Sequence, residues 1–158
     1  MTPEKALELV VRPGLALLPV KMQGARAETM LLTIGLQESK FKYRNQIGGP
    51  AHGFYQFESG GGVRGVLKHP SSEGVIAALL KDLEIPSENA YSAIVYNDVL
   101  ATAFARLLLW TDPLGLPAVA SEPSLSWKYY LRTWRPGKPH EATWALHRAA
   151  AIAAVGEP

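Results

Sequence analysis

One acidic residue stands where an apolar helix is expected to end. Leu31, Ile34 and Gly35 lie seven, four and three residues before Glu38. This spacing puts Glu38 on or beside the buried stripe of a helix. Apolar surroundings disfavour the carboxylate anion and so raise the pKa of such a group. Because a glutamic acid that keeps its proton at neutral pH can act as a general acid, Glu38 is the leading candidate for a catalytic residue.

A second group of candidate residues is aromatic. Trp127, Tyr130 and Trp134 recur at helical spacing and are followed by Arg135 and a Pro-Gly pair. Aromatic residues at this spacing pack in cores more often than they bind ligands. Here, however, they adjoin a loop and two arginines, and apolar rings with hydrogen-bonding tips suit the binding of pyranose sugars.

Other reactive side chains do not form recognisable sites. Ser39 is next to Glu38, but no histidine and aspartate accompany it in the pattern of a nucleophilic serine. The four histidines are scattered and lack the paired spacing of a zinc-binding helix, and there is no cysteine to supply a thiolate ligand or a disulfide. We therefore expect no metal ion and no cofactor.

The elements that must position these residues are predicted to be helices. The central helix is expected over residues 25–41, followed by an irregular loop over 42–53 that contains three glycines and a proline. No segment alternates with period two for long, which predicts an all-α fold with at most a small hairpin in that loop. The expected helices outside the central one cover 3–12, 63–68, 72–85, 87–96, 98–110, 125–134 and 140–154, and a short apolar piece over 15–22 is interrupted by Pro19.

Three of these helices carry particular expectations. Thr2 and Pro3 are expected to start the first helix, which should stop before Pro13, and Ser124 is expected to cap the helix over 125–134. The segment 91–109 has almost no charge, so its second helix should be the most buried. Three consecutive glycines at 60–62 are expected to form a flexible hinge.

Length and composition indicate one soluble globular domain over residues 1–158. The chain has 47% hydrophobic and 19% charged residues, a net charge of +2 and an isoelectric point near 8.9. The charge is too small, and too evenly spread, to indicate nucleic-acid binding. No apolar run approaches the length of a membrane span, and the start lacks the pattern of a secretory signal. We expect a monomer without membrane insertion.

The segment 38–56 resembles the goose-type lysozyme and lytic transglycosylase superfamily. Members end a central helix in Glu-Ser and continue through a loop to a Gly-Leu-Met-Gln element, and here Glu38-Ser39 is followed by Gly53-Phe54-Tyr55-Gln56. The resemblance implies a lysozyme-like fold and makes Glu38 the catalytic acid. It also implies that Ser39 supports the surroundings of the acid, and it places Ser39, Gly53, Phe54, Tyr55 and Gln56 among the substrate-binding residues. Gln56 could instead only hydrogen-bond the loop, and Phe54 and Tyr55 could equally pack in the core.

The resemblance extends to two further residues. Related enzymes supply, from a late segment, a tyrosine whose hydroxyl contacts the acid; Tyr130 is the first candidate here, with Tyr129 and Tyr96 as alternatives. Goose-type lysozymes also have a carboxylate two residues after the glutamine, where this chain has Glu58. Such a group helps to position the attacking water, so Glu58 favours hydrolysis, although it could be an ordinary surface carboxylate. A further acid of the goose-type pattern is missing near Ala51 and His52.

These features predict a peptidoglycan muramidase that cleaves the β-1,4 bond between N-acetylmuramic acid and N-acetylglucosamine. Its partner would be the glycan strand. The first alternative is a lytic transglycosylase that uses Glu38 and leaves 1,6-anhydromuramic ends. The second is a non-catalytic helical module of a virion. Without a signal peptide, we expect a bacteriophage endolysin that another protein releases from the host cytoplasm to the periplasm and wall, or a wall-cutting virion component.

Overall fold

The computed structural model describes residues 1–156, and this part of the chain folds into one all-α domain without β-strands. The predicted all-α class is thus confirmed. Pairing of the β type within residues 1–156 is limited to two isolated bridges, Asn45 with His52 and His52 with Phe57, where the 42–53 loop folds back on itself. No single helix among the described residues is long and apolar enough to cross a membrane; α6 and α7 together, with the turn before them, reach that length only as a pair bent by 117°.

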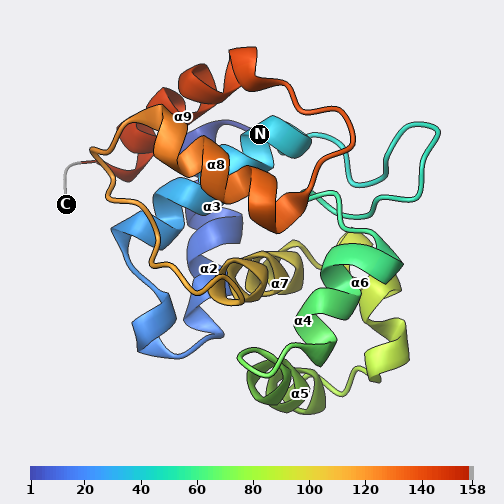
Figure 1. Ribbon diagram of the computed structural model, residues 1–158. Helices are drawn as coiled ribbons and strands as arrows, with labels where there is room; N and C mark the ends of the chain where they lie inside the picture. Colours follow the sequence, from blue (N-terminus) through green and yellow to red (C-terminus); the bar gives the residue numbers. More distant parts are fainter. Residues whose placement is uncertain (157–158) are drawn as a thin grey trace.

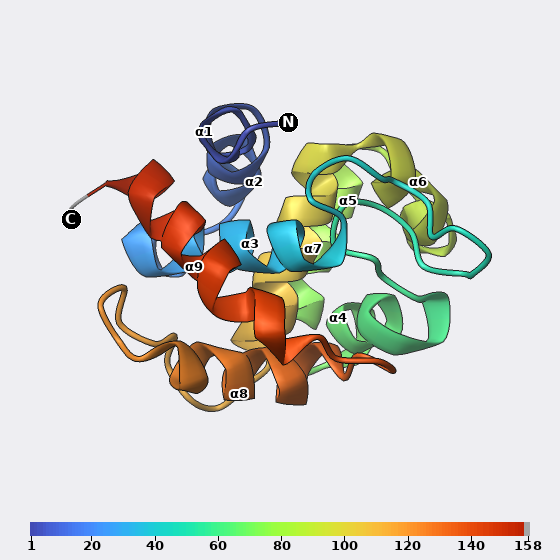
Figure 2. The ribbon, with the colours of Figure 1, turned by 90° about the horizontal axis from the view of Figure 1, so that it is seen from above.

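Helix α7 (Asp98–Trp110) lies at the centre of the molecule (Figures 1 and 2). Every residue from Leu100 to Leu109 is buried, which confirms that this is the most buried segment. Asn97 separates α7 from α6 (Ala90–Tyr96), and its side-chain oxygen accepts a hydrogen bond from the Leu100 N–H at 2.9 Å. This bond satisfies one of the N–H groups that lack a partner at a helix start.

The other helices form two groups on either side of α7 (Figures 1 and 2). The first group contains the N-terminal helices, α3, α8 and α9, and the second contains α4, α5 and α6. The first group comprises α1 (Pro3–Ala6), α2 (Arg12–Ala16), α3 (Ala25–Glu38), α8 (Pro123–Trp134) and α9 (Glu141–Val155). In the second, α4 spans Arg64–Lys68 and α5 spans Glu73–Asp82. Helix α7 contacts α2 and α3 on one side and α4 and α6 on the other.

The first helix does not stop before Pro13. A π-helical turn over Leu7–Val11 joins α1 to α2, and in this wider turn the Arg12 N–H bonds to Leu7 O. Pro13 then occupies the first turn of α2, where the N–H that proline lacks is not needed. Helix α2 also approaches α7 closely, because a Cβ on Gly14 would lie only 2.4 Å from Thr102 Cβ. The expected end before Pro13 is therefore wrong.

Helix α3 ends at Glu38, three residues earlier than expected. The backbone turns sharply there, since Lys40 and Phe41 have φ values of +56° and +50°. This turn folds the Phe41 ring back onto Gly35, where a Cβ would meet the ring carbon Cζ at 2.0 Å. Phe41 is buried, so the gain from burying its ring accounts for the early stop.

One expectation about a capping residue is also corrected. Helix α8 starts at Pro123 with Glu122, not Ser124, as the residue before it. The three glycines at 60–62, where a hinge is expected, lie in a π-helical turn, Ser59–Val63, that leads into α4 but is kinked at Gly61, whose φ of −103° and ψ of −109° are not helical. At Gly62 the reason for glycine is space, because a Cβ would come within 2.4 Å of the Phe57 ring.

Candidate active site

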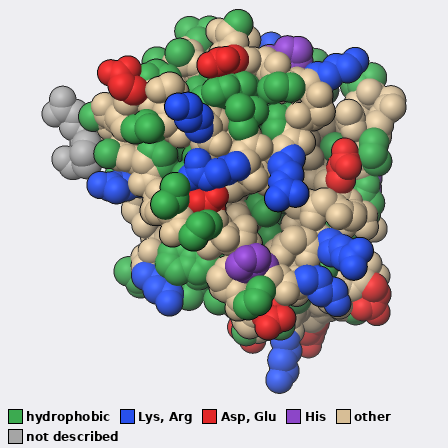
Figure 3. Space-filling model, in the orientation of Figure 1, with side chains coloured by type: hydrophobic (Ala, Val, Ile, Leu, Met, Phe, Trp, Pro, Cys, Tyr) green, Lys and Arg blue, Asp and Glu red, His purple; other side chains and the backbone are tan. Residues whose placement is uncertain are grey.

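A large cleft lies between the two groups of helices. Its volume is about 1230 Å³, and its lining comes from both groups: from α3, α8 and the loop before α9 on one side, and from residues 56–65 and His69 on the other. Figure 3 shows the face that carries α8 and α4, where blue Lys and Arg side chains outnumber red acidic ones. Four of the predicted site residues line the cleft, namely Glu38, Gln56, Glu58 and Tyr130.

Glu38 is half-buried at the end of α3, and its carboxyl group faces the cleft. Burial raises the pKa of Glu38 from its ordinary value of 4.5 to about 7, and a hydrogen bond from Tyr130 opposes part of this rise. Burial acts in this direction because it disfavours the charged form. At neutral pH a substantial fraction of Glu38 therefore holds a proton that it can donate.

Tyr130 is the tyrosine that contacts Glu38. Its hydroxyl donates a hydrogen bond of 2.6 Å to Glu38 Oε1, which is the contact implied by the resemblance. Burial, together with the nearby Glu38 carboxyl group, raises the pKa of Tyr130, so this hydroxyl remains a donor. Of the two alternatives, Tyr129 donates to the Leu109 and Leu114 carbonyls and Tyr96 is 84% exposed.

The Tyr130 ring is fixed by tryptophans. It stacks on Trp144 of α9 at a centroid distance of 4.7 Å and packs against Trp127 at 5.3 Å. Trp144 is buried and donates its indole N–H to Ser126 Oγ at 2.9 Å. Helices α8 and α9 therefore hold the tyrosine hydroxyl in place beside the acid of α3.

Glu58 lies on the opposite wall of the same cleft. It is exposed, immediately precedes the π-helical turn and has extended backbone angles. The cleft thus contains a half-buried carboxyl group and an exposed one. Two carboxyl groups in such different environments can take different roles, one as a proton donor and the other as an ionised carboxylate.

Gln56 lines the cleft and also supports the loop. Its backbone is left-handed with φ of +54°, and its side-chain N–H group donates to Gly53 O at 3.0 Å. The two interpretations of Gln56 are therefore compatible, because one end of the side chain holds the loop while the residue faces the cleft.

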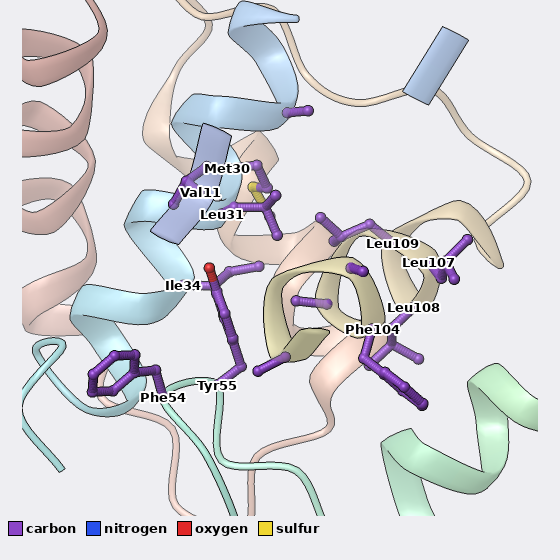
Figure 4. Close-up of a cluster of buried hydrophobic side chains, with 14 of the residues drawn as sticks. Val11, Met30, Leu31, Ile34, Phe54, Tyr55, Phe104, Leu107, Leu108 and Leu109 are labelled. Carbon is purple, nitrogen blue, oxygen red and sulfur yellow. The ribbon is translucent and has the colours of Figure 1, made fainter. Parts of the chain in front are cut away.

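Four other residues predicted to bind substrate do not line the cleft. Phe54 and Tyr55 are 1% and 0% exposed; Phe54 packs edge-on against Phe41, and the Tyr55 hydroxyl pairs with Thr102 Oγ1 at 3.0 Å. Figure 4 shows both in the cluster of buried side chains, with the Tyr55 ring between α3 and α7. The expectation that they contact sugar is corrected: they are core residues.

Ser39 and Gly53 also serve the backbone rather than a ligand. Ser39 is buried, donates its hydroxyl to Gly35 O at 3.3 Å and accepts the Phe41 N–H at 3.1 Å, so it stabilises the turn after Glu38. Gly53 has φ of +76°, and a Cβ there would lie 2.7 Å from Ile94 O. The expectation that Ser39 and Gly53 contact substrate is therefore corrected: both residues support the backbone.

Further residues line the cleft, and of these only Trp134 belongs to the aromatic group noted in the sequence. Asp112 and Arg132 line it as an ion pair with Nε and Oδ2 2.7 Å apart. Trp134 also lines it and donates its indole N–H to Tyr55 O at 3.0 Å. The sequence signal for Trp134 was its helical spacing from Tyr130, whereas nothing in the sequence indicates that Asp112 faces this cleft.

No group of histidine, aspartate and glutamate side chains within residues 1–156 is arranged to hold a metal ion. The chemistry that the described residues offer is proton donation by Glu38 and hydrogen bonding by polar groups along a wide cleft. Comparison of the chain with protein-family models, with curated proteins and with solved structures finds no match.

Proposed function

We propose that this protein is a peptidoglycan muramidase with a lysozyme-like fold. The observation that carries this proposal is the half-buried Glu38, whose raised pKa of about 7 and hydrogen bond from Tyr130 make it a positioned acid on the wall of a cleft. The cleft volume of about 1230 Å³ exceeds the roughly 300–1,000 Å³ typical of small-molecule pockets, which favours a polymeric substrate.

In the proposed reaction, protonated Glu38 donates its proton to the glycosidic oxygen as positive charge develops on the sugar ring. Glu58, on the opposite wall, orients a water molecule toward the other face of that ring. Tyr130 keeps the Glu38 carboxyl group in one orientation through its 2.6 Å hydrogen bond. After the proton has left, the same hydrogen bond stabilises the carboxylate.

The sequence supports this assignment independently of the cleft. Glu38-Ser39, the glycine-containing loop and Gly53 to Gln56 resemble goose-type lysozymes and lytic transglycosylases. Each of these pieces contributes residues to the cleft lining, namely Glu38, Gln46, Ala51 and Gln56. On this proposal the protein belongs with bacteriophage lysins, either endolysins or virion components, and acts alone on the glycan strand.

Replacement of the acid tests the proposal. Glu38→Gln keeps the size and the hydrogen bond from Tyr130 but cannot donate a proton, so the rate of turbidity loss of purified peptidoglycan should fall by at least about 100-fold. Glu84→Gln, which removes an exposed acid outside the cleft, is the control and should keep full activity. Normal clearing by folded Glu38→Gln protein would contradict the proposal, and no clearing by the wild type would favour a non-catalytic virion module.

A lytic transglycosylase is the second candidate, because the acid of the goose-type pattern is missing near Ala51 and His52 and Glu58 is an exposed side chain. Such an enzyme uses the same acid but lets a hydroxyl of the sugar attack. Mass spectrometry of the digest distinguishes the two: reducing ends indicate hydrolysis, and 1,6-anhydromuramic ends indicate the transglycosylase. Loss of the reducing-end product in Glu58→Gln would identify Glu58 as the group that orients water.

A further inference from the structure

The two walls of the cleft differ in the side chains that they present. The wall formed by residues 58–65 contains four glycines, whereas the opposite wall, formed by the end of α8 and the loop to residue 140, carries Arg132, Arg135 and Lys138. The cleft is therefore roomy on one side and cationic on the other.

At two of the four positions, space does not require glycine. A Cβ on Gly60 would meet no atom within 4 Å, and one on Gly61 would meet only Glu58 Cβ at 3.7 Å. Gly60 also lacks the positive φ that favours glycine, whereas the Gly61 backbone, with φ of −103° and ψ of −109°, lies outside the regions usual for residues with a Cβ. At Gly60, therefore, neither space nor backbone conformation requires glycine. The space that a side chain would fill at these positions is space in the cleft, so the absent side chains leave room for a ligand.

Arg135 is placed on the opposite wall at some conformational cost. It follows the last residue of α8 with φ of +50° and ψ of +54°, a left-handed conformation that is usually occupied by glycine at a helix end. An arginine held in this conformation suggests that its side chain, rather than its backbone, is required there.

Arg135 and Lys138 are also available to a ligand. The ion pairs among residues 1–156 join Arg12 to Glu28, Arg44 to Asp98 and Arg132 to Asp112, so neither cation is neutralised within this part of the chain. Both side chains are exposed. A guanidinium group and an ammonium group from residues three positions apart that line the same cleft suit carboxylates.

We infer that Arg135 and Lys138 form a subsite for carboxylates on a branch of the polymer, with the Gly60–Gly61 wall leaving room for the branch. This inference rests on the proposed function and narrows its substrate to glycan strands that still carry peptide stems. In such strands the stem supplies the carboxylates, since the lactyl group of muramic acid is tied up in an amide. After the stem is removed, the lactyl carboxylate is free and is the second possible source.

The test compares Arg135→Gly, Lys138→Gln and the double variant with the wild type. Lys128→Gln is the matched control, because Lys128 is exposed on α8 but does not line the cleft. Three substrates are used: intact peptidoglycan, the same material with its carboxylates converted to neutral amides, and glycan from which an amidase has removed the stems. The quantities measured are kcat and KM, together with the thermal midpoint of each variant.

On intact peptidoglycan we expect the KM of the double variant to rise about three- to tenfold, as expected for the loss of two exposed charge contacts, with little change in kcat. Neutralising the substrate should raise the wild-type KM to the same degree and leave the double variant unchanged. The glycan without stems identifies the source of the carboxylates. If the wild-type KM on it is as high as on neutralised material, the stem carboxylates are the ligand. If that KM is as low as on intact material, the lactyl carboxylate is the ligand and the stem assignment is overturned.

Arg135→Gly separates binding from folding. Glycine relieves the left-handed conformation, so the thermal midpoint should stay the same or rise while KM rises. Unchanged KM in the double variant, or equal KM values for intact and neutralised substrate with the wild type, would overturn the subsite. If the wild type cleaves none of the three substrates, the proposed function itself is wrong.

Discussion

At the scale of single residues, the proposed chemistry depends on Glu38 and Tyr130, which are 92 positions apart in the chain. The residues before Glu38 were enough to predict an acid on the buried side of a helix. The identity of its partner was not predictable in the same way, because Tyr129 and Tyr130 are adjacent and only the rotation of α8 decides which one faces the acid. In the structure Tyr129 points to the end of α7 and Tyr130 to Glu38.

Tyr130→Phe should change the pH dependence of cleavage. The hydroxyl stabilises the carboxylate form of Glu38, so its removal raises the pKa of Glu38 above about 7. In the proposed reaction the acid works in its protonated form, so activity should fall as the pH rises through this pKa, and the alkaline limb of the pH profile should move to higher pH in the variant. Tyr96→Phe, which changes an exposed tyrosine, should leave the limb in place. A shift to lower pH in Tyr130→Phe would contradict the role given to the hydroxyl.

At the scale of elements, the bend between α6 and α7 depends on a single cap. The Asn97 side chain accepts the Leu100 N–H, and this bond starts the helix that packs against both groups. Capping residues and turn residues are visible in the sequence, which is why this bend and the end of α9 at Gly156 were predictable. The continuation of the first helix through Pro13 was not predictable, because the π-helical turn before it depends on packing against α3 and α7.

Asn97→Ala should therefore destabilise the fold by about 1 kcal/mol, the usual cost of losing a helix cap. The chain offers a matched control in Asn89, which precedes α6 without making a side-chain capping bond. Asn89→Ala should change stability by less than about 0.5 kcal/mol, as expected for a surface position. Urea denaturation of the two variants measures the difference. Equal destabilisation would show that the Asn97 bond contributes nothing specific.

At the scale of the whole molecule, the buried acid couples stability to pH. The pKa of Glu38 is about 7 in the folded chain, against an ordinary value of 4.5. Between these two values the folded chain holds a proton that the unfolded chain releases. The free energy of unfolding therefore falls as the pH rises from 4.5 to 7, by about 3 kcal/mol in total for a shift of this size.

Glu38→Gln should remove this fall in the free energy of unfolding with rising pH. The uncharged amide resembles the protonated acid, so the variant and the wild type should be equally stable near pH 4, whereas the variant should be more stable by about 2–3 kcal/mol at pH 8. Urea denaturation across this pH range measures the effect. The same series with Glu84→Gln corrects for the general effect of losing one negative charge. A stability difference that does not depend on pH would mean that Glu38 is not perturbed by burial.

Features that depend on residues close in sequence were predictable, whereas features that depend on distant residues were not. Helices, the position of Glu38 and the irregular loop follow from residues that are close in sequence. The cleft does not, because its walls come from segments up to about a hundred residues apart. Phe54 and Tyr55 illustrate this: the residue pattern marks them as notable, but only the packing of α3 and α7 shows that they are inside.

The packing of α9 along α3 has a consequence for synthesis of the protein. The acid lies at the end of α3, but its tyrosine and the tryptophan on which that tyrosine stacks follow it by about a hundred residues, so they leave the ribosome later. A nascent chain that ends before Trp144 contains Glu38 without its support. Translation thus delays the assembly of this group until Trp144 has been made, and fragments that end earlier should lack a positioned acid.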